Sequence, residues 1–411
     1  MASGRGAVPA MRRVDEVDLH GKRVFVRVDF NTPLAPGPDG ALRVTDDTRV
    51  REALPTLRYV VEQGGRLVVG SHLGRPKGRR DPKMSLAPPV ARLAELLGRP
   101  VPLVKDVVGP EVEARIAALK PGEAIALENL RFEPGEEKND PHLAAALAKL
   151  ADVYVNDAFG AAHRAHASTA GMVPLVPVRA AGFLMQKELD YLGEVLADPR
   201  RPFVAVLGGA KVSDKIGVLE RLVELADLVV VGGAMAYTFL KAQGVRVGRS
   251  LVEEGHVGQA SQLIAAARQR EAKLLLPVDH VIVRSLESPG EARSTEGAEI
   301  PDGWLGVDIG PESADRFARE IRGAKTVVWN GPMGIFETPA YAGGTHAVAN
   351  AVAEATKTGA TTIVGGGDSV SAARQAGVIS HVTHVSTGGG ASLEFLEGKA
   401  LPGVAALAAG R

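Results

Sequence analysis

Two lysines beside a glycine pair are the first residues whose types and spacing suggest chemistry. Lys211 and Lys215 stand four residues apart in the segment GGAKVSDKIGVL. Gly208 and Gly209 precede them, after an apolar run at 203–207 that is typical of a strand buried on both faces. Because a glycine turn that opens a helix offers backbone N–H groups to an anion, and the lysines add positive charge, this stretch predicts a phosphate site.

The residues after the lysines predict a helix, with Ser213 as its N-cap and apolar side chains at helical spacing. The chain contains neither a Walker A string nor G-x-G-x-x-G. Taken alone, the stretch is equally consistent with an ordinary α/β turn that carries solvated lysines. The rest of the sequence has to decide between the two.

Basic residues follow several predicted strands in the first half of the chain. The strands are expected at 23–28, 66–70, 124–128 and 152–156, and DFN, SHLGRP, NLRF and DAFGAAHRAHAS follow them. Ligands of parallel sheets bind outside the carboxyl ends of the strands, and arginine matches phosphate and carboxylate oxygens. We therefore predict a site for a small, multiply anionic molecule. Its candidates are Asp29, Asn31, Arg49, His72, Arg75, Arg131 and Arg164.

For any one of these arginines a solvated surface charge is the alternative, and the clustering disfavours it for the whole set. The histidines of this half could also suggest a metal site. That interpretation is disfavoured because no carboxylate or second histidine stands at ligand spacing.

The strand ends of the second half are rich in glycine instead. They read GGAKVSDK, GGAM, NGPMGIFE, GGGDS and STGGGAS. Glycines let backbone N–H groups approach phosphate oxygens closely. Asp368 is placed to hold Mg²⁺ between phosphates, and Glu337 is a candidate for ribose hydroxyls. This half therefore predicts a site for a magnesium nucleotide.

Length and composition restrict the class of protein. The chain has 411 residues, 45% of them hydrophobic, with no cysteine and a formal net charge of zero. Its length favours two domains, and the missing cysteines exclude disulfides and thiolate metal sites. Balanced charge gives no sign of nucleic acid or an anionic membrane as partner. We expect a cytoplasmic protein, because neither a signal peptide nor a membrane span is apparent.

Valine-rich runs alternate with amphipathic stretches along the whole chain, which predicts parallel sheets covered by helices on both faces. Further strands are expected at 203–207, 227–232, 273–276, 325–329, 360–364 and 381–385. An amphipathic helix is expected at 182–196, and a domain boundary near 180–200. A helix between two α/β lobes suits an enzyme that closes by hinge motion.

Long segments of the chain resemble the signature segments of the phosphoglycerate kinase family. They occur in the family's order: RVDFNTPL, SHLGRP, LENLRF, VNDAFGAAHRAHAS, GGAKVSDKI, VWNGPMGIFE, GGGDS and STGGGASLEFLEGK. The resemblance implies an α/β protein of two Rossmann-like three-layer lobes with parallel sheets. It implies a phosphoglycerate-binding domain at 1–181 plus 397–411, an interdomain helix at 182–198 and a nucleotide-binding domain at 199–396.

The activity implied is reversible, Mg²⁺-dependent phosphoryl transfer from 1,3-bisphosphoglycerate to ADP, giving 3-phosphoglycerate and ATP. By resemblance, the substrate-binding residues are Asp29, Phe30, Asn31, Arg49, His72, Leu73, Gly74, Arg75, Arg131 and Arg164. The nucleotide-binding residues are Gly208, Gly209, Lys211, Lys215, Gly232, Gly233, Gly306, Asn330, Pro332, Glu337, Gly366, Gly367, Asp368 and Ser369. Catalysis is expected from Arg49, Lys211, Gly367 and Gly390.

Within these sets the resemblance implies particular roles. Lys211 would move with the transferred phosphoryl group, Lys215 would hold nucleotide phosphate, and Asp368 would bind Mg²⁺. Ser369 would cap a helix near the phosphates, and Gly306 would help to shape the adenosine pocket. The segment VGGAMAYTF departs from the family pattern at Ala234, where a third glycine is expected.

Transfer is expected to be in-line, after closure of the two lobes. Small-molecule substrates and a monomer are expected, without nucleic acid or membrane. A phosphohistidine route through His72 is a minor alternative. A dinucleotide-dependent oxidoreductase and a non-catalytic binding protein are the alternatives from other functional classes.

Overall fold

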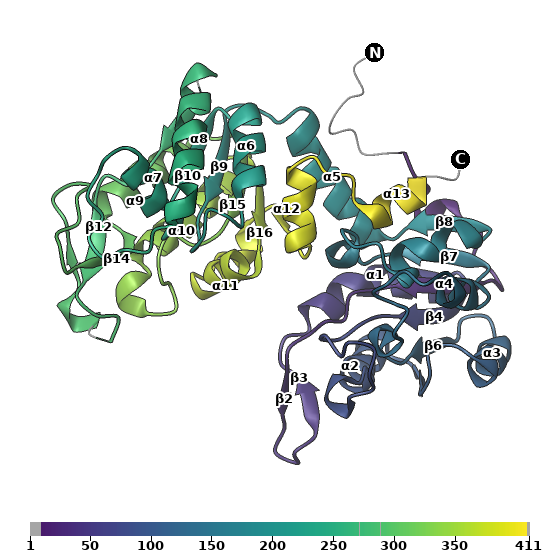
Figure 1. The fold of residues 1–411 in the computed structure, drawn as a ribbon. Coiled ribbons are helices and arrows are strands. Elements are labelled where there is room, and N and C mark those ends of the chain that lie inside the picture. Colours follow the sequence, from purple (N-terminus) through teal and green to yellow (C-terminus); the bar gives the residue numbers. More distant parts are fainter. Residues whose placement is uncertain (1–9, 271, 288, 409–411) are drawn as a thin grey trace. The chain divides into compact units, whose positions relative to one another are not determined.

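The computed structural model describes residues 10–270, 272–287 and 289–408. Within them the chain divides into two compact units (Figure 1). The first unit takes the described residues of Val8–Asp190 and Ala400–Arg411, and the second unit is Tyr191–Lys399.

The first unit is built on a six-stranded sheet in the order β5-β6-β4-β1-β7-β8, in which every neighbouring pair is parallel. Short valine-rich runs form these strands because both faces are buried. The strands are β1 (Arg23–Arg27), β4 (Arg66–Gly70), β5 (Leu103–Val104), β6 (Ala124–Leu127), β7 (Val153–Asn156) and β8 (Val178–Ala181). Antiparallel β2 (Leu34–Pro36) and β3 (Leu42–Val44) form a separate ribbon.

Helices cover this sheet and complete the core. Val24 and Val26 of β1, two residues apart on one face, share a buried cluster with Leu57. The helices are α1 (Thr48–Glu62), α2 (Ala87–Leu97), α3 (Pro110–Ala117), α4 (Pro141–Ala148) and α13 (Pro402–Ala408). The C-terminal helix α13, yellow in Figure 1, lies beside β8, and the Gly403 amide donates to the Ala162 carbonyl at 2.9 Å.

The second unit has its own six-stranded parallel sheet, in the order β11-β10-β9-β15-β16-β17. Its strands are β9 (Phe203–Leu207), β10 (Leu228–Val231), β11 (Lys273–Leu275), β15 (Thr326–Asn330), β16 (Thr361–Gly365) and β17 (His384–Val385). Its helices are α6 (Ile216–Leu225), α7 (Met235–Ala242), α8 (Val257–Gln269), α9 (Pro311–Arg322), α10 (Gly343–Lys357), α11 (Gly367–Gln375) and α12 (Gly390–Leu396).

All ten strands expected from the sequence are present, within a residue or two except β17, which is shorter. The sequence did not predict β2, β3, β5 and β8, nor an antiparallel sheet in the second unit made of β12 (His280–Val283), β13 (Arg293–Ser294) and β14 (Leu305–Ile309). These strands are short or lack a continuous apolar run, so local pattern alone does not mark them.

The amphipathic helix expected at 182–196 is α5 (Phe183–Ala197). Leu184, Leu189 and Leu192 of its apolar face are buried. The division between the two units falls inside this helix, between Asp190 and Tyr191. Among the described residues no helix is long and apolar enough to cross a membrane.

The first amides of α5 donate to a buried carboxyl group. Oδ1 of Asp157 accepts hydrogen bonds from the amides of Leu184 at 2.9 Å and Met185 at 3.2 Å. Burial raises the pKa of Asp157 to about 7, although these hydrogen bonds lower it. The native state therefore holds a proton that the unfolded chain has already lost between about pH 4 and pH 7.

We expect Asp157 to make the protein less stable as pH rises through this window, because ionising the buried carboxyl opposes folding. Between pH 5 and pH 8 its contribution should fall by about 2 to 3 kcal/mol, and Asp157→Asn should abolish that slope. Urea unfolding followed by circular dichroism measures it. Asp140→Asn is the matched control, because Asp140 caps α4 through two amides but is only half-buried. Equal pH slopes for wild type and Asp157→Asn would contradict the prediction.

Candidate functional site

The first unit brings the predicted anion-binding residues together at the carboxyl ends of its strands. Arg49, at the start of α1, forms an ion pair with Asp29, which follows β1. His72 follows β4, and its Nε2 lies 3.9 Å from Asp29 Oδ1. The Gly74 amide donates to Asn31 Oδ1 at 2.8 Å. Parallel strands end at one edge of a sheet, so residues distant in sequence meet here.

Two more arginines belong to the same cluster. Arg131, only 4% exposed, donates from Nη1 to the Gly74 carbonyl at 2.8 Å. Burial lowers the pKa of Arg131, and repulsion from Arg27 and Arg164 adds to the effect. Arg164 donates from Nε to His163 Nε2 at 3.1 Å. A mutually repelling set of arginines is unfavourable by itself, so this edge is suited to bind a multiply charged anion.

The remaining predicted residues of this set contribute differently. Arg75 is exposed and follows Gly74 directly. The side chains of Phe30 and Leu73 are buried in the core. The Phe30 amide donates to Ser71 Oγ at 2.8 Å, which fixes the loop after β1.

At the centre of the cluster, burial and neighbouring charges shift the pKa values of Asp29 and His72. Burial raises the pKa of Asp29, but the charged groups around it, among them the guanidinium groups of Arg49 and Arg27, lower it, and the net shift is downward. Burial also holds the pKa of His72 well below its usual value, with Arg27 adding to this effect. At neutral pH the site therefore contains a carboxylate, a neutral imidazole and several guanidinium groups.

Sequence reasoning missed three buried polar residues behind this cluster: Arg27, Glu136 and Ser168. The Arg27 guanidinium donates from Nε to Ser168 Oγ at 2.8 Å, and Ser168 Oγ donates to Glu136 Oε1 at 2.5 Å. Each of the three is 0% exposed. The signal available was an arginine inside the valine-rich run RVFVRV, where a charge is costly unless it is paired.

In the second unit the glycine turn after β9 lies against the turn after β15. The Gly208 amide donates to the Asn330 carbonyl and the Gly209 amide to the Pro332 carbonyl, each at 3.0 Å. A Cβ on Gly208 would lie 2.1 Å from the Pro332 oxygen. Only glycine allows this approach of the two backbones, so the residue is required here for packing as well as for flexibility.

Lys215 is placed behind this pair of turns. Its Nζ donates to the Gly208 carbonyl at 2.6 Å and to the Asn330 carbonyl at 2.8 Å. Burial lowers the pKa of Lys215 to about 8, against the attraction of Asp368 and Asp214. The ammonium thus supports the loops in this structure, while Lys211 is exposed at the same strand end.

Two predicted helix caps are wrong. The helix α6 begins at Ile216 with Lys215 as N-cap, so Ser213 lies before the helix, and its hydroxyl donates to Glu253 Oε1 at 2.7 Å. Ser369 does not cap α11, whose N-cap is Gly366. The Ser369 hydroxyl accepts a hydrogen bond from the Gly331 amide at 2.5 Å and so ties the turn after β15 to α11.

The other predicted nucleotide-binding residues occupy the loops around these turns. Gly367, Asp368 and Glu337 are exposed, and Gly390 begins α12. Gly232 and Gly233 follow β10, where a Cβ on Gly232 would lie 2.3 Å from Met333 Sδ. Gly306 lies on β14, where an added Cβ would lie 2.0 Å from the Tyr237 hydroxyl.

The donor set in these loops suits a metal that is held mainly by phosphate. No group of three or more His, Asp or Glu side chains that could bind a metal occurs in the part of the chain that the structure describes. Asp368 supplies one exposed carboxylate at the start of α11. Mg²⁺ prefers oxygen ligands and in nucleotide sites takes one or two carboxylates together with phosphate oxygens, so the residues present fit it.

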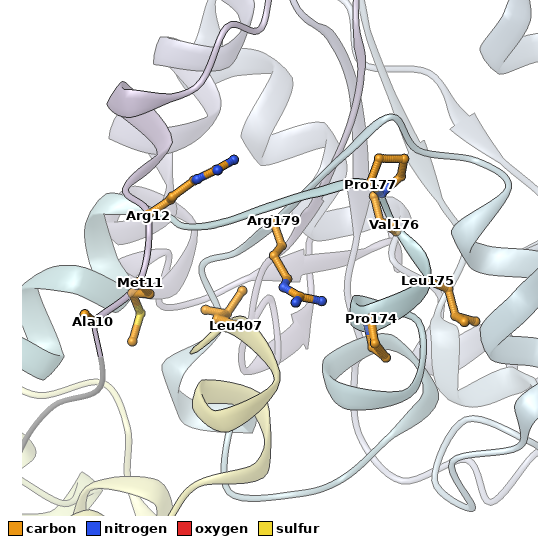
Figure 2. A pocket seen from close by; sticks show the side chains of 9 residues that line it. All are labelled: Ala10, Met11, Arg12, Pro174, Leu175, Val176, Pro177, Arg179 and Leu407. Carbon is orange, nitrogen blue, oxygen red and sulfur yellow. The ribbon is translucent and has the colours of Figure 1, made fainter. Parts of the chain in front are cut away.

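A pocket of about 250 Å³ in the first unit contains none of the predicted site residues. Figure 2 shows the Arg179 side chain pointing into it between Leu407 and Pro174. Arg179 lies on β8, away from the cluster of Asp29 and His72 at the strand ends. The cluster of Asp29 and His72 is thus an edge of the sheet lined by charged groups, and this pocket is a separate feature.

Comparison with known proteins agrees with this arrangement. A family model described as phosphoglycerate kinase matches residues 14–399. A phosphoglycerate kinase of Moorella thermoacetica is 57% identical, over 95% of this chain and 98% of its own. One of Chloroflexus aurantiacus is 56% identical, over 96% and 98% of the two chains.

Solved structures show the same fold. The phosphoglycerate kinase of Coxiella burnetii superposes with a TM-score of 0.86 and 40% identity, covering 97% of this chain and 99% of its own. That of Pyrococcus horikoshii superposes with a TM-score of 0.79 and 34% identity, covering 97% and 98%. The chain belongs to the phosphoglycerate kinase family.

Proposed function

We propose that the chain transfers a phosphoryl group reversibly from 1,3-bisphosphoglycerate to Mg-ADP, with the site residues in the roles that the sequence predicts. The reaction is inferred from membership of the phosphoglycerate kinase family. The observation that best supports the residue roles is the cluster at the strand ends of the first unit, where Arg49 and Arg131 lie close to one carboxylate and a neutral histidine and Arg164 lies close to Arg131. Such a cluster matches a ligand with several anionic groups.

The two ligands are assigned to different units. The arginines are in the first unit, and the glycine turns with Lys211, Lys215 and Asp368 are in the second. Direct in-line transfer then requires the units to bring their ligands together, and closure would exclude water from the acyl phosphate. The acceptor in the ATP-forming direction is an ionised phosphate, so no general base is required.

The residues of each unit have separate tasks in this proposal. Arg49 and Lys211 would neutralise charge on the transferred group, and the amides of Gly367 and Gly390 would add donors to it. Mg²⁺, when bound, neutralises nucleotide phosphate charge. Asp368 would hold it, and Glu337 would bind the ribose.

A coupled assay tests the proposed function. The protein is given 3-phosphoglycerate, Mg-ATP, glyceraldehyde-3-phosphate dehydrogenase and NADH. Loss of NADH absorbance that requires both substrates and Mg²⁺ is the expected result. If the folded protein binds nucleotide but NADH is not consumed, the motifs reflect common descent without activity. The alternative of a non-catalytic binding protein then replaces the proposal. NADH loss without 3-phosphoglycerate would instead indicate an oxidoreductase.

Asp368→Asn should weaken the response to Mg²⁺. Because Asp368 is the carboxylate assigned to the metal, we expect the Mg²⁺ concentration for half-maximal rate to rise by about tenfold or more. Titration of Mg²⁺ at fixed nucleotide measures it. Asp315→Asn changes an exposed carboxylate on α9 and is the control. An unchanged Mg²⁺ response in Asp368→Asn would remove this residue from the metal site.

A further inference from the structure

The guanidinium of Arg27 lies directly behind His72. Its three nitrogens each have a partner: Nε donates to Ser168 Oγ at 2.8 Å, Nη1 to the Val28 carbonyl at 2.5 Å, and Nη2 lies 3.2 Å from His72 Nδ1. Arginine has only donors and does not lose its proton in proteins. In the contact with Arg27, Nδ1 of His72 must therefore be the acceptor.

An accepting Nδ1 determines where the proton of His72 resides. In a neutral imidazole one nitrogen accepts and the other carries hydrogen, so Nε2 is protonated. Nε2 is on the ring edge toward Asp29, 3.9 Å from its Oδ1. The charged groups that face His72 are Asp29, Arg27, Arg131 and Arg49, and the three arginines disfavour a second proton on the ring. His72 thus directs an N–H donor into the cluster.

Arg27 is itself held in place by a hydrogen-bond network that begins at Ser168. Ser168 donates from Oγ to Glu136 Oε1 at 2.5 Å and from its amide to Oε2 at 3.0 Å. The Tyr154 hydroxyl donates to the Ser168 carbonyl at 2.8 Å. Burying the charged groups Arg27 and Glu136 costs free energy of desolvation. When the hydrogen bonds of such a network are made, as they are here, they hold its members in one geometry.

We propose that Arg27, oriented by Ser168 and Glu136, is a positioning residue that keeps His72 as the Nε2–H tautomer, so that His72 donates a hydrogen bond to an anionic oxygen of the phosphoglycerate ligand. The part that concerns the ligand rests on the proposed function, whereas the tautomer does not. The same tautomer argues against a phosphohistidine at His72, because Nε2 has no lone pair for attack and Nδ1 is occupied by Arg27.

The tautomer can be measured without any substrate. Long-range nitrogen–proton NMR on protein with ¹⁵N-labelled histidine rings distinguishes the three protonation states, and His72→Gln assigns the signals. We expect an unprotonated Nδ1 and a protonated Nε2 for His72 in the wild type at neutral pH. A protonated Nδ1, whether in a neutral or a charged ring, would overturn the proposal with the native protein alone.

Arg27→Lys tests the positioning role, because lysine keeps the charge but cannot make three directed hydrogen bonds. We expect His72 to lose its single tautomer and the KM for 3-phosphoglycerate to rise about tenfold, with the KM for Mg-ATP unchanged. Ser168→Ala, a milder change, should act in the same direction. Arg23→Lys, on the same strand but ion-paired with Asp152 at its other end, is the matched control and should change neither quantity.

The outcomes separate the two proposals. An unchanged tautomer in a folded Arg27→Lys protein, or equal increases in both KM values, refutes the positioning role. If the NMR results are as expected but the wild type shows no phosphoryl transfer, the tautomer assignment stands and the proposed function fails.

Discussion

Replacing Lys211 by alanine should lower kcat by a factor of about 10² to 10³, with little change in the KM for nucleotide. Lys211 is exposed where the strand β9 ends, whereas Lys215 is engaged by two carbonyls. An exposed ammonium can follow charge onto the group being transferred, and losing one such donor from a transition state has an effect of this size. Steady-state kinetics in the coupled assay measure it.

The control for this variant is Lys325→Ala. Lys325 is exposed directly before β15, at the opposite end of the same sheet, so a general effect of surface charge would appear in both proteins. If Lys211→Ala raises the KM for nucleotide and leaves kcat unchanged, Lys211 contributes to ground-state binding and its assigned role is incorrect.

Gly331→Ala should give the largest loss of stability among the substitutions considered. Gly331 has φ of +106°, and a Cβ there would lie 2.2 Å from the Gly208 oxygen and 2.5 Å from Lys215 Nζ. Backbone strain and overpacking together should lower the free energy of unfolding by about 2 to 5 kcal/mol. The two turns would also separate, so nucleotide binding should weaken.

Gly359→Ala separates the two causes. Gly359 has φ of +89°, but no described atom lies within 4 Å of its Cβ position, so only the strain of about 1 to 2 kcal/mol remains. Both tryptophans, Trp304 and Trp329, lie in the second unit, so urea unfolding followed by their fluorescence reports on that unit. Equal losses in the two variants would show that the close contact of the turns is unimportant.

Much of the fold follows from patterns a few residues long. Strands such as 203–207 and 326–330 contain continuous apolar runs bounded by glycine or polar residues, which identifies a strand buried on both faces. The alternation of such runs with amphipathic stretches implies parallel pairing. Parallel pairing in turn places the residues after each strand at one edge, which is why the sequence pattern alone is enough to group Asp29, His72 and Arg131.

Local pattern fails where a partner distant in sequence decides the outcome. Ser213 has the right type and place for an N-cap, but Glu253, 40 residues away, takes its hydroxyl. Ser369 binds the Gly331 amide, 38 residues away, rather than capping its own helix. A cap is a preference of about 1 kcal/mol, and a tertiary hydrogen bond to a carboxylate or a buried amide is worth as much.

The sequence by itself determined most strands of the two parallel sheets, the charge of each set of strand ends and the family. Only the tertiary structure decided which polar groups are buried together: Arg27 with Ser168, 141 residues apart, and Lys215 with the carbonyl of Asn330, 115 residues apart. The spacing of apolar residues is a pattern among residues close together along the chain, so it can be read directly from the sequence. The partner of a buried charge is set by how the strands and turns pack, and that requires the folded chain.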